Sequence, residues 1–124
     1  MAKRILLADD SAFMRTMLKS ILTNAGFEIA AEAQSGEEAV QKYRDLQPDL
    51  ITMDLVMLGK GGLKAVKDIM AKDKFARILM VSSMGGQQAL VVEAIQAGAR
   101  GFVVKPFEPE QLVAEVKRIL GSES

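Results

Sequence analysis

The sequence contains no cysteine and no histidine. The absence of cysteine excludes disulfides, thiolate metal sites and a cysteine nucleophile. The absence of histidine excludes an imidazole general base, and with it Ser-His-Asp and Cys-His catalysis and the usual zinc hydrolase sites. Any chemistry must therefore come from carboxylates, hydroxyls, lysine and arginine.

Long apolar runs and an excess of one charge are also missing. Sixteen basic residues balance sixteen acidic ones among 124 residues, so we expect no nucleic-acid binding through charge alone. The sequence has no run of about 18 apolar residues, the length that a membrane helix needs. Its start, Met1 to Arg4, is unlike a secretory signal. We therefore expect a cytoplasmic protein with no membrane insertion.

Short apolar runs alternate with longer amphipathic stretches along the chain, a pattern typical of strand-helix units around a parallel sheet. Five such units in 124 residues predict one domain, residues 1–124, with a three-layer open sheet rather than an eight-unit barrel. The predicted strands are 5–8, 27–33, 50–53, 78–82 and 102–104. The predicted helices lie between Ser11 and Gly26, from Ser35 to about 47, at 63–72, through 90–95 and through 112–120.

Polar residues follow four of the predicted strands. In an open parallel sheet, ligands bind beyond the carboxyl ends of the strands. We therefore expect three carboxylates, a hydroxyl and an ammonium to converge at one edge of the sheet. The residues at these strand ends are Asp9 and Asp10, Asp54, Ser82 and Ser83, and Lys105 with Pro106.

Each of these features alone has an ordinary structural explanation, such as a helix cap or a turn. Asp54 is different, because an acid that closes an apolar strand costs free energy unless something pairs with it. Clustered carboxylates repel one another unless a cation is present, and oxygen ligands without histidine or cysteine favour Mg²⁺. With its charge offset by the metal and Lys105, Asp54 could attack a phosphorus atom. Ser83 and Lys105 could then bind the phosphoryl oxygens.

These residues, in this order and at these separations, resemble the response-regulator receiver family over essentially the full chain. The segments Asp9 to Arg15 and Met84 to Gln88 are most similar to the chemotaxis type. The resemblance implies an α/β, flavodoxin-like fold with a doubly wound five-stranded parallel sheet, and it alone supplies the strand order 2-1-3-4-5. The chain departs from the family pattern at Leu58, where proline is usual, and at Met84, where a small residue is usual.

The resemblance implies a stand-alone response regulator of a two-component phosphorelay, in chemotaxis or motility signalling. Asp54 would accept a phosphoryl group from a CheA-like histidine kinase. Asp10 would bind Mg²⁺ directly and Asp9 through water, while Asp54 and the backbone carbonyl of Val56 would complete the protein ligands. Lys105 would contact the phosphoryl oxygens. Such a protein is not an enzyme for a separate substrate but a phosphoacceptor that catalyses its own phosphotransfer and dephosphorylation.

The resemblance also implies a switch and an output surface. Ser83 would move toward the phosphoryl group, and Phe102 would stand in the family's aromatic switch position. A motor component or another output protein would bind the monomer on the surface of the fourth helix, fifth strand and fifth helix. The residues that we expect near this partner are Gln88, Phe102, Val104 and Phe107.

Three alternatives stay open on the sequence. A phosphorelay shuttle would use the same site. An aspartate-nucleophile phosphatase of the haloacid dehalogenase type would carry a second acid two residues after the nucleophile, where this chain has Val56. A flavin-binding flavodoxin-like protein would have a phosphate loop rich in serine and threonine after the first strand, which this chain lacks.

Overall fold

Five parallel strands lie side by side at the centre of the computed structural model, which describes residues 2–57, 61–83 and 88–121. The order in the sheet is β2-β1-β3-β4-β5, which confirms the predicted doubly wound α/β fold and its strand order. The strands are β1 (Arg4–Ala8), β2 (Glu28–Ala33), β3 (Leu50–Met53), β4 (Ile78–Ser83) and β5 (Gly101–Lys105). The helices are α1 (Ala12–Asn24), α2 (Gly36–Leu46), α3 (Gly62–Lys72), α4 (Gln88–Ala97) and α5 (Pro109–Leu120).

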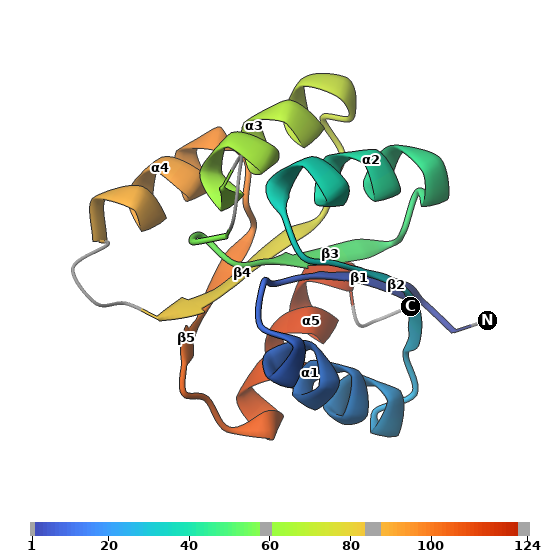
Figure 1. Cartoon of the computed structure of the whole chain (residues 1–124). Coiled ribbons are helices and arrows are strands. Elements are labelled where there is room, and N and C mark those ends of the chain that lie inside the picture. The colour runs from blue at the N-terminus through green and yellow to red at the C-terminus, as the bar shows by residue number, and fades with distance from the viewer. Residues whose placement is uncertain (1, 58–60, 84–87, 122–124) are drawn as a thin grey trace.

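Helices cover both faces of the sheet (Figure 1). The helices α2, α3 and α4 lie on one face, and α1 and α5 lie on the other. The side chains of β1 alternate between the two cores, with Leu6 and Ala8 packed toward α2 to α4 and Ile5 and Leu7 packed toward α1 and α5. Because both faces of the sheet are buried, β1 is an unbroken apolar run rather than an alternation of apolar and polar residues.

The helix starts follow capping signals in the sequence. The hydroxyl of Ser11 accepts from the N–H of Met14 (3.1 Å) at the start of α1, and that of Ser35 accepts from the N–H of Glu38 (3.1 Å) at the start of α2. The spacing of Ser35 and Glu38 also fits a capping box, in which the N–H of Ser35 would donate to the carboxylate of Glu38. The Glu38 carboxylate accepts instead from the N–H of Gln34 (2.8 Å), one residue further out.

The last helix, α5, begins at Pro109, three residues before Leu112, the first residue of the apolar pattern that predicts this helix. Proline suits the first helical turn, because its missing N–H would have no helical partner there. The first-turn residues Pro109 and Glu110 are exposed, so apolar spacing does not reveal them. Within the described ranges, no helix is both long and apolar enough to cross a membrane.

Candidate functional site

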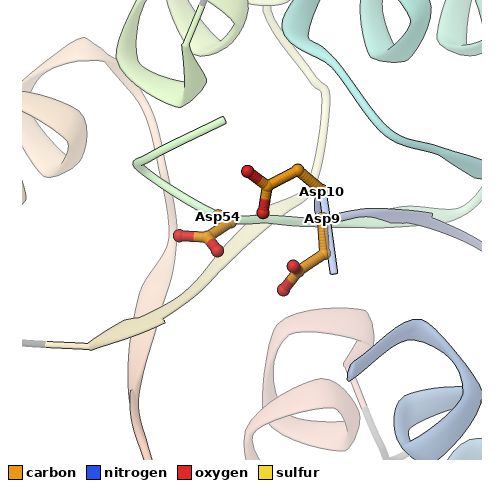
Figure 2. Close-up of side chains that lie close together, drawn as sticks. All are labelled: Asp9, Asp10 and Asp54. Carbon is orange, nitrogen blue, oxygen red and sulfur yellow. The ribbon is translucent and has the colours of Figure 1, made fainter. Parts of the chain in front are cut away.

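The carboxyl ends of β1 and β3 bring three acidic residues together. The N–H of Asp9 donates to the carbonyl of Ala33 (3.0 Å), and the N–H of Asp54 donates to the carbonyl of Ala8 (3.1 Å). These bonds extend the pairing of the strands by one residue, so both aspartates leave the sheet at the same edge. Figure 2 shows their carboxyl groups beside that of Asp10, beyond the strand ends.

The acidic cluster of Asp9, Asp10 and Asp54 has the composition and size of a site for a hard cation. One carboxylate oxygen from each residue lies within 4.8 Å of the other two. In an octahedral Mg²⁺ site, ligands at about 2.1 Å stand about 4.2 Å apart across the metal. Asp9 and Asp54 are buried and Asp10 is exposed, so the cluster has two fixed ligands and one that can adjust. The three carboxylates therefore fit a magnesium-sized ion with little movement.

Lys105, the last residue of β5, joins two of the three carboxylates. Its Nζ donates to Oδ2 of Asp9 (2.7 Å) and to Oδ2 of Asp54 (3.0 Å). Burial alone would lower the pKa of Lys105, but its hydrogen bonds and charge interactions with the two aspartates outweigh burial and raise the pKa. The ammonium therefore stays charged and offsets part of the negative charge of the cluster.

Asp9 is the most deeply enclosed acid of the cluster. Burial raises its pKa, against the hydrogen bonds from Lys105 and from the N–H of Ser11 (2.9 Å), which lower it. Two carboxylates raise the pKa of Lys105, because both accept hydrogen bonds from its ammonium. Asp9 shares this one ammonium with Asp54, so the effect of burial on the pKa of Asp9 is not fully offset. A divalent cation beside Asp9 would act against burial, lower this pKa and favour the ionised form.

An arginine holds the backbone of Asp9 from the side of α1. The guanidinium of Arg15 donates to the carbonyl of Asp9 (2.5 Å) and to Oε1 of Glu32 (2.9 Å). The hydrogen bond from Arg15 is the main reason why the pKa of Glu32 lies below its usual range. The pair therefore links β2 to the end of β1 and supports the position of Asp9. The sequence alone did not indicate this contact.

The hydroxyl that contacts Asp54 belongs to Ser82, the neighbour of the Ser83 that is predicted to bind the phosphoryl oxygens. Ser82 is 1% exposed, and its Oγ donates to Oδ1 of Asp54 (2.5 Å). The same oxygen accepts from the N–H of Val56 (3.2 Å). Ser83 is exposed and lies in register with Lys105. Neighbouring strand residues point to opposite faces, so only one of two adjacent serines can face Asp54 at a time.

The start of α3 lies against the backbone of Asp54. The N–H of Gly62 donates to the carbonyl of Leu55 (2.9 Å). A Cβ added to Gly62 would lie 2.0 Å from the carbonyl oxygen of Asp54 and 2.8 Å from the Cα of Leu55. Only glycine fits in this position, and the close approach fixes the first turn of α3 relative to Asp54.

The residues predicted for the switch and the output surface are spread over both sides of the sheet. Phe102 is half-buried and packs toward α2 to α4, whereas Phe107 is half-buried and packs toward α1 and α5. Val104 is half-buried on β5, and Gln88 is exposed at the start of α4. The two departures from the family pattern, Leu58 and Met84, lie outside the described residues.

Comparison with known protein families gives one clear match. The family model described as the response regulator receiver domain matches residues 5–117. Two chemotaxis proteins named CheY are similar over nearly their whole lengths. The one from Thermotoga maritima is 52% identical over 96% of this chain and 98% of the relative. The one from Bacillus subtilis is 50% identical over 97% of this chain and 99% of the relative.

Solved structures show the same similarity. The CheX-CheY-BeF3-Mg²⁺ complex from Borrelia burgdorferi contains a chain that matches with a TM-score of 0.90 and 35% identity, over 94% of this chain and 88% of that one. The response regulator domain of Thermotoga maritima CheB matches with a TM-score of 0.89 and 35% identity, over 98% of both chains.

Proposed function

This chain belongs to the response regulator receiver family, and we propose that it works by accepting a phosphoryl group on Asp54 with Mg²⁺ bound beside it. It is a CheY-like receiver domain, a chemotaxis response regulator by its similarity over nearly the full chain. The observation that carries the proposal is Lys105, whose ammonium bridges Asp54 and Asp9 at the carboxyl edge of the sheet. A carboxylate between a cation site and an ammonium is arranged to receive a group that carries negative charge.

Three residues of this chain would have separate roles in phosphoryl transfer. The Asp54 carboxylate supplies the attacking oxygen, and the donor's leaving group departs with the electron pair of the broken bond. Lys105 already lies 3.0 Å from Oδ2 of Asp54 and would bind the oxygens of the incoming phosphoryl group. Ser83 would bind another phosphoryl oxygen after a movement from its exposed position. We therefore propose that the domain catalyses its own phosphotransfer and dephosphorylation.

We propose Mg²⁺ as the cation of the site. Asp10 would bind it directly, Asp9 through water, and Asp54 and the carbonyl of Val56 would complete the protein ligands. The exposure of Asp10 and the oxygen-only composition of the cluster support this assignment. When bound, the ion would offset the charge of both the carboxylates and the phosphoryl oxygens. The CheY complex from Borrelia burgdorferi also contains Mg²⁺.

We propose residues 1–124 as one receiver domain that acts in the cytoplasm as a monomer. A CheA-like histidine kinase would be the phosphoryl donor, and a motor component or other output protein would bind the surface of α4, β5 and α5. The chemotaxis relatives support this choice over a phosphorelay shuttle. The phosphatase alternative is not favoured, because Val56 stands where that mechanism needs a second acid.

Incubation with acetyl phosphate and Mg²⁺ is expected to add a single phosphoryl group to the protein, detected by intact mass spectrometry. The reaction should stop when Mg²⁺ is chelated, since the carboxylates then repel the donor. The phosphorylation rate of Asp10→Ala should not depend on the Mg²⁺ concentration and should equal the rate of the wild-type protein with Mg²⁺ chelated. The matched control is Asp45→Asn, an exposed acid on α2, which should react like wild type. Equal incorporation with and without Mg²⁺ would contradict the proposed metal site.

We propose that phosphorylation of Asp54 changes the conformation of the output surface, formed by α4, β5 and α5, through Ser83 and Phe102. A hydrogen bond from Ser83 to a charged phosphoryl oxygen would favour one of two states by on the order of 1.5–3 kcal/mol, a population shift of roughly tenfold to a hundredfold. Phe102 is half-buried and could turn further inward when Ser83 moves. Its partly buried position on β5 supports this part of the proposal.

Adding beryllofluoride and Mg²⁺ is therefore expected to shift backbone NMR signals of α4, β5 and α5 as well as those around Asp54. The distant shifts should disappear in Ser83→Ala and persist in Ser20→Ala, which removes an exposed hydroxyl on α1. Shifts confined to the surroundings of Asp54 in the wild-type protein would show that Phe102 is an ordinary core residue.

A further inference from the structure

Arg15, on α1, holds the peptide group that joins Asp9 to Asp10. Its guanidinium donates to the carbonyl oxygen of Asp9 (2.5 Å) and to Oε1 of Glu32 on β2 (2.9 Å). The side chain of Arg15 is only 14% exposed, so both bonds lie largely away from water. A guanidinium is a planar fork of donors, and two acceptors at once fix its orientation. The carbonyl of Asp9 therefore accepts from a donor that is itself held in place.

Asp10 depends on this peptide group more than the other two acids of the cluster do. Lys105 donates to both Asp9 and Asp54, which fixes their carboxylates. The carboxylate of Asp10 is exposed, and it has no hydrogen-bond or ion-pair partner in the part of the chain that the structure describes. A peptide group is planar, so fixing the carbonyl of Asp9 also fixes the nitrogen and Cα of Asp10. The direction of the Asp10 side chain is therefore set through the backbone.

We propose that Arg15 is a positioning residue of the metal site, which directs Asp10 toward the cation and thereby sets the affinity of the acidic cluster for Mg²⁺. This inference rests on the proposed function, which assigns Asp10 as the direct ligand. Residues behind the ligands of a metal orient those ligands, and their loss typically lowers metal affinity by about 10- to 100-fold. Arg15 has such a place, because it contacts the backbone between two of the acids.

The charge of Arg15 acts in the opposite direction. A guanidinium beside a cation site repels a divalent ion, so by charge alone its removal would strengthen Mg²⁺ binding. By position, its removal frees the peptide group between Asp9 and Asp10 and weakens Mg²⁺ binding. Because Mg²⁺ demands near-ideal octahedral placement of its ligands, we expect position to outweigh charge. The sign of the change in affinity therefore separates the two effects.

Arg15→Met tests this inference without any phosphoryl donor. Titration with Mg²⁺ alone, followed by backbone amide NMR signals around Asp54, should give a Kd at least about tenfold higher than in wild type. If Arg15→Met does not fold, Arg15→Lys takes its place. One ammonium lacks the fork that contacts the carbonyl of Asp9 and Glu32 together, so the Kd should rise in the same direction. A Kd at or below the wild-type value in the variant measured would overturn the inference.

Lys19→Met is the matched control. Lys19 is also on α1 and pairs with the same acid, with its Nζ 3.3 Å from Oε2 of Glu32, its one ion-pair partner among the described residues. The change removes the same charge and leaves the hydrogen bond to the carbonyl of Asp9 in place. The Mg²⁺ Kd of Lys19→Met should stay at or slightly below the wild-type value, as charge alone predicts. A rise equal to that of Arg15→Met would overturn the inference.

A second measurement uses the metal-free protein. The carbonyl ¹³C signal of Asp9 and the amide ¹⁵N signal of Asp10 should move in Arg15→Met and stay in place in Lys19→Met. Unmoved signals in Arg15→Met would count against the inference as firmly as an unchanged Kd.

The dependence of phosphorylation on Mg²⁺ gives a third measurement. Arg15→Met should need at least about tenfold more Mg²⁺ for half-maximal incorporation from acetyl phosphate, yet reach the wild-type rate when Mg²⁺ is saturating. A merely structural role would lower the free energy of unfolding in urea and leave the Mg²⁺ requirement unchanged, which would refute a positioning role.

The proposed function and this inference fail in different experiments. A wild-type protein that binds Mg²⁺ but takes up no phosphoryl group at Asp54 refutes the phosphoacceptor, while the Kd values still decide the role of Arg15. A wild-type protein that is phosphorylated normally, with the Kd unchanged in Arg15→Met, refutes only the role of Arg15. A wild-type protein that binds no Mg²⁺ refutes both.

Discussion

Asp54→Asn is expected to lower phosphoryl incorporation by at least about a thousandfold while leaving the fold intact, because an amide has the shape of the carboxylate but is not a nucleophile. Its oxygen can still accept from the hydroxyl of Ser82 and the N–H of Val56, which now hold Oδ1. The ammonium of Lys105 loses one charged partner but keeps Asp9. Intact mass spectrometry after incubation with acetyl phosphate and Mg²⁺ measures the loss, and circular dichroism checks the fold.

Two variants make the result for Asp54 specific. Asp45→Asn carries the same chemical change on an exposed acid of α2 and should incorporate as much as wild type. Lys105→Met should slow incorporation without abolishing it, since it leaves the nucleophile in place. If Asp54→Asn is phosphorylated at the wild-type rate under native conditions, another residue is the acceptor.

The second large effect is expected on stability. Gly62→Ala should lower the free energy of unfolding by about 3 kcal/mol, because the new Cβ enters space that backbone atoms fill. The nearest atom is the carbonyl oxygen of Asp54 at 2.0 Å, and no side-chain rotation can relieve the clash. Either α3 or the end of β3 must move. Urea denaturation of both proteins measures the loss.

A glycine elsewhere provides the comparison for Gly62. Gly26 has φ +98 and nothing within 4 Å of an added Cβ, so Gly26→Ala tests backbone strain without a clash. Its cost should be about 1–2 kcal/mol, the penalty for a left-handed backbone. A Gly62→Ala protein within about 0.5 kcal/mol of wild type, the range of ordinary surface changes, would show that the start of α3 moves easily. Phosphorylation of Gly62→Ala should also slow, because the displaced backbone belongs to Asp54.

The fold and the acidic cluster could be predicted from the sequence for a physical reason. A strand such as β1, buried on both faces, must be an unbroken apolar run, and an acid directly after it is therefore conspicuous. Parallel strands also end at one edge of the sheet, and the strand order supplied by the family resemblance makes β1 and β3 neighbours, so Asp9 and Asp54 were expected to meet there. The contacts of Lys105 with them do not follow from the order of the sheet alone, because β5 lies two strands from β3 and the long lysine side chain must reach across.

The choice between Ser82 and Ser83 could not be predicted in the same way. Both follow an apolar run, and which one faces Asp54 depends on how far β4 continues and on the face that each residue takes. The sequence pattern ends the strand at Ser82, whereas in the structure β4 continues through Ser83. The contact of Arg15 with the carbonyl of Asp9 was missed for a similar reason. It depends on the reach of one long side chain, which residue spacing does not express.

The hydrogen bonds from Lys105 to Asp9 and Asp54 also have a consequence for folding during synthesis on the ribosome. Asp9 and Lys105 are 96 residues apart in the chain, and Asp54 and Lys105 are 51 apart. A chain still being synthesised has therefore made all three acids of the cluster well before the cation that joins two of them. Contacts of such long range form late, after the loop between them has closed. The proposed phosphorylation site thus cannot be complete until β5 pairs at the edge of the sheet. A chain that still lacks β5 should therefore not yet be competent for phosphorylation.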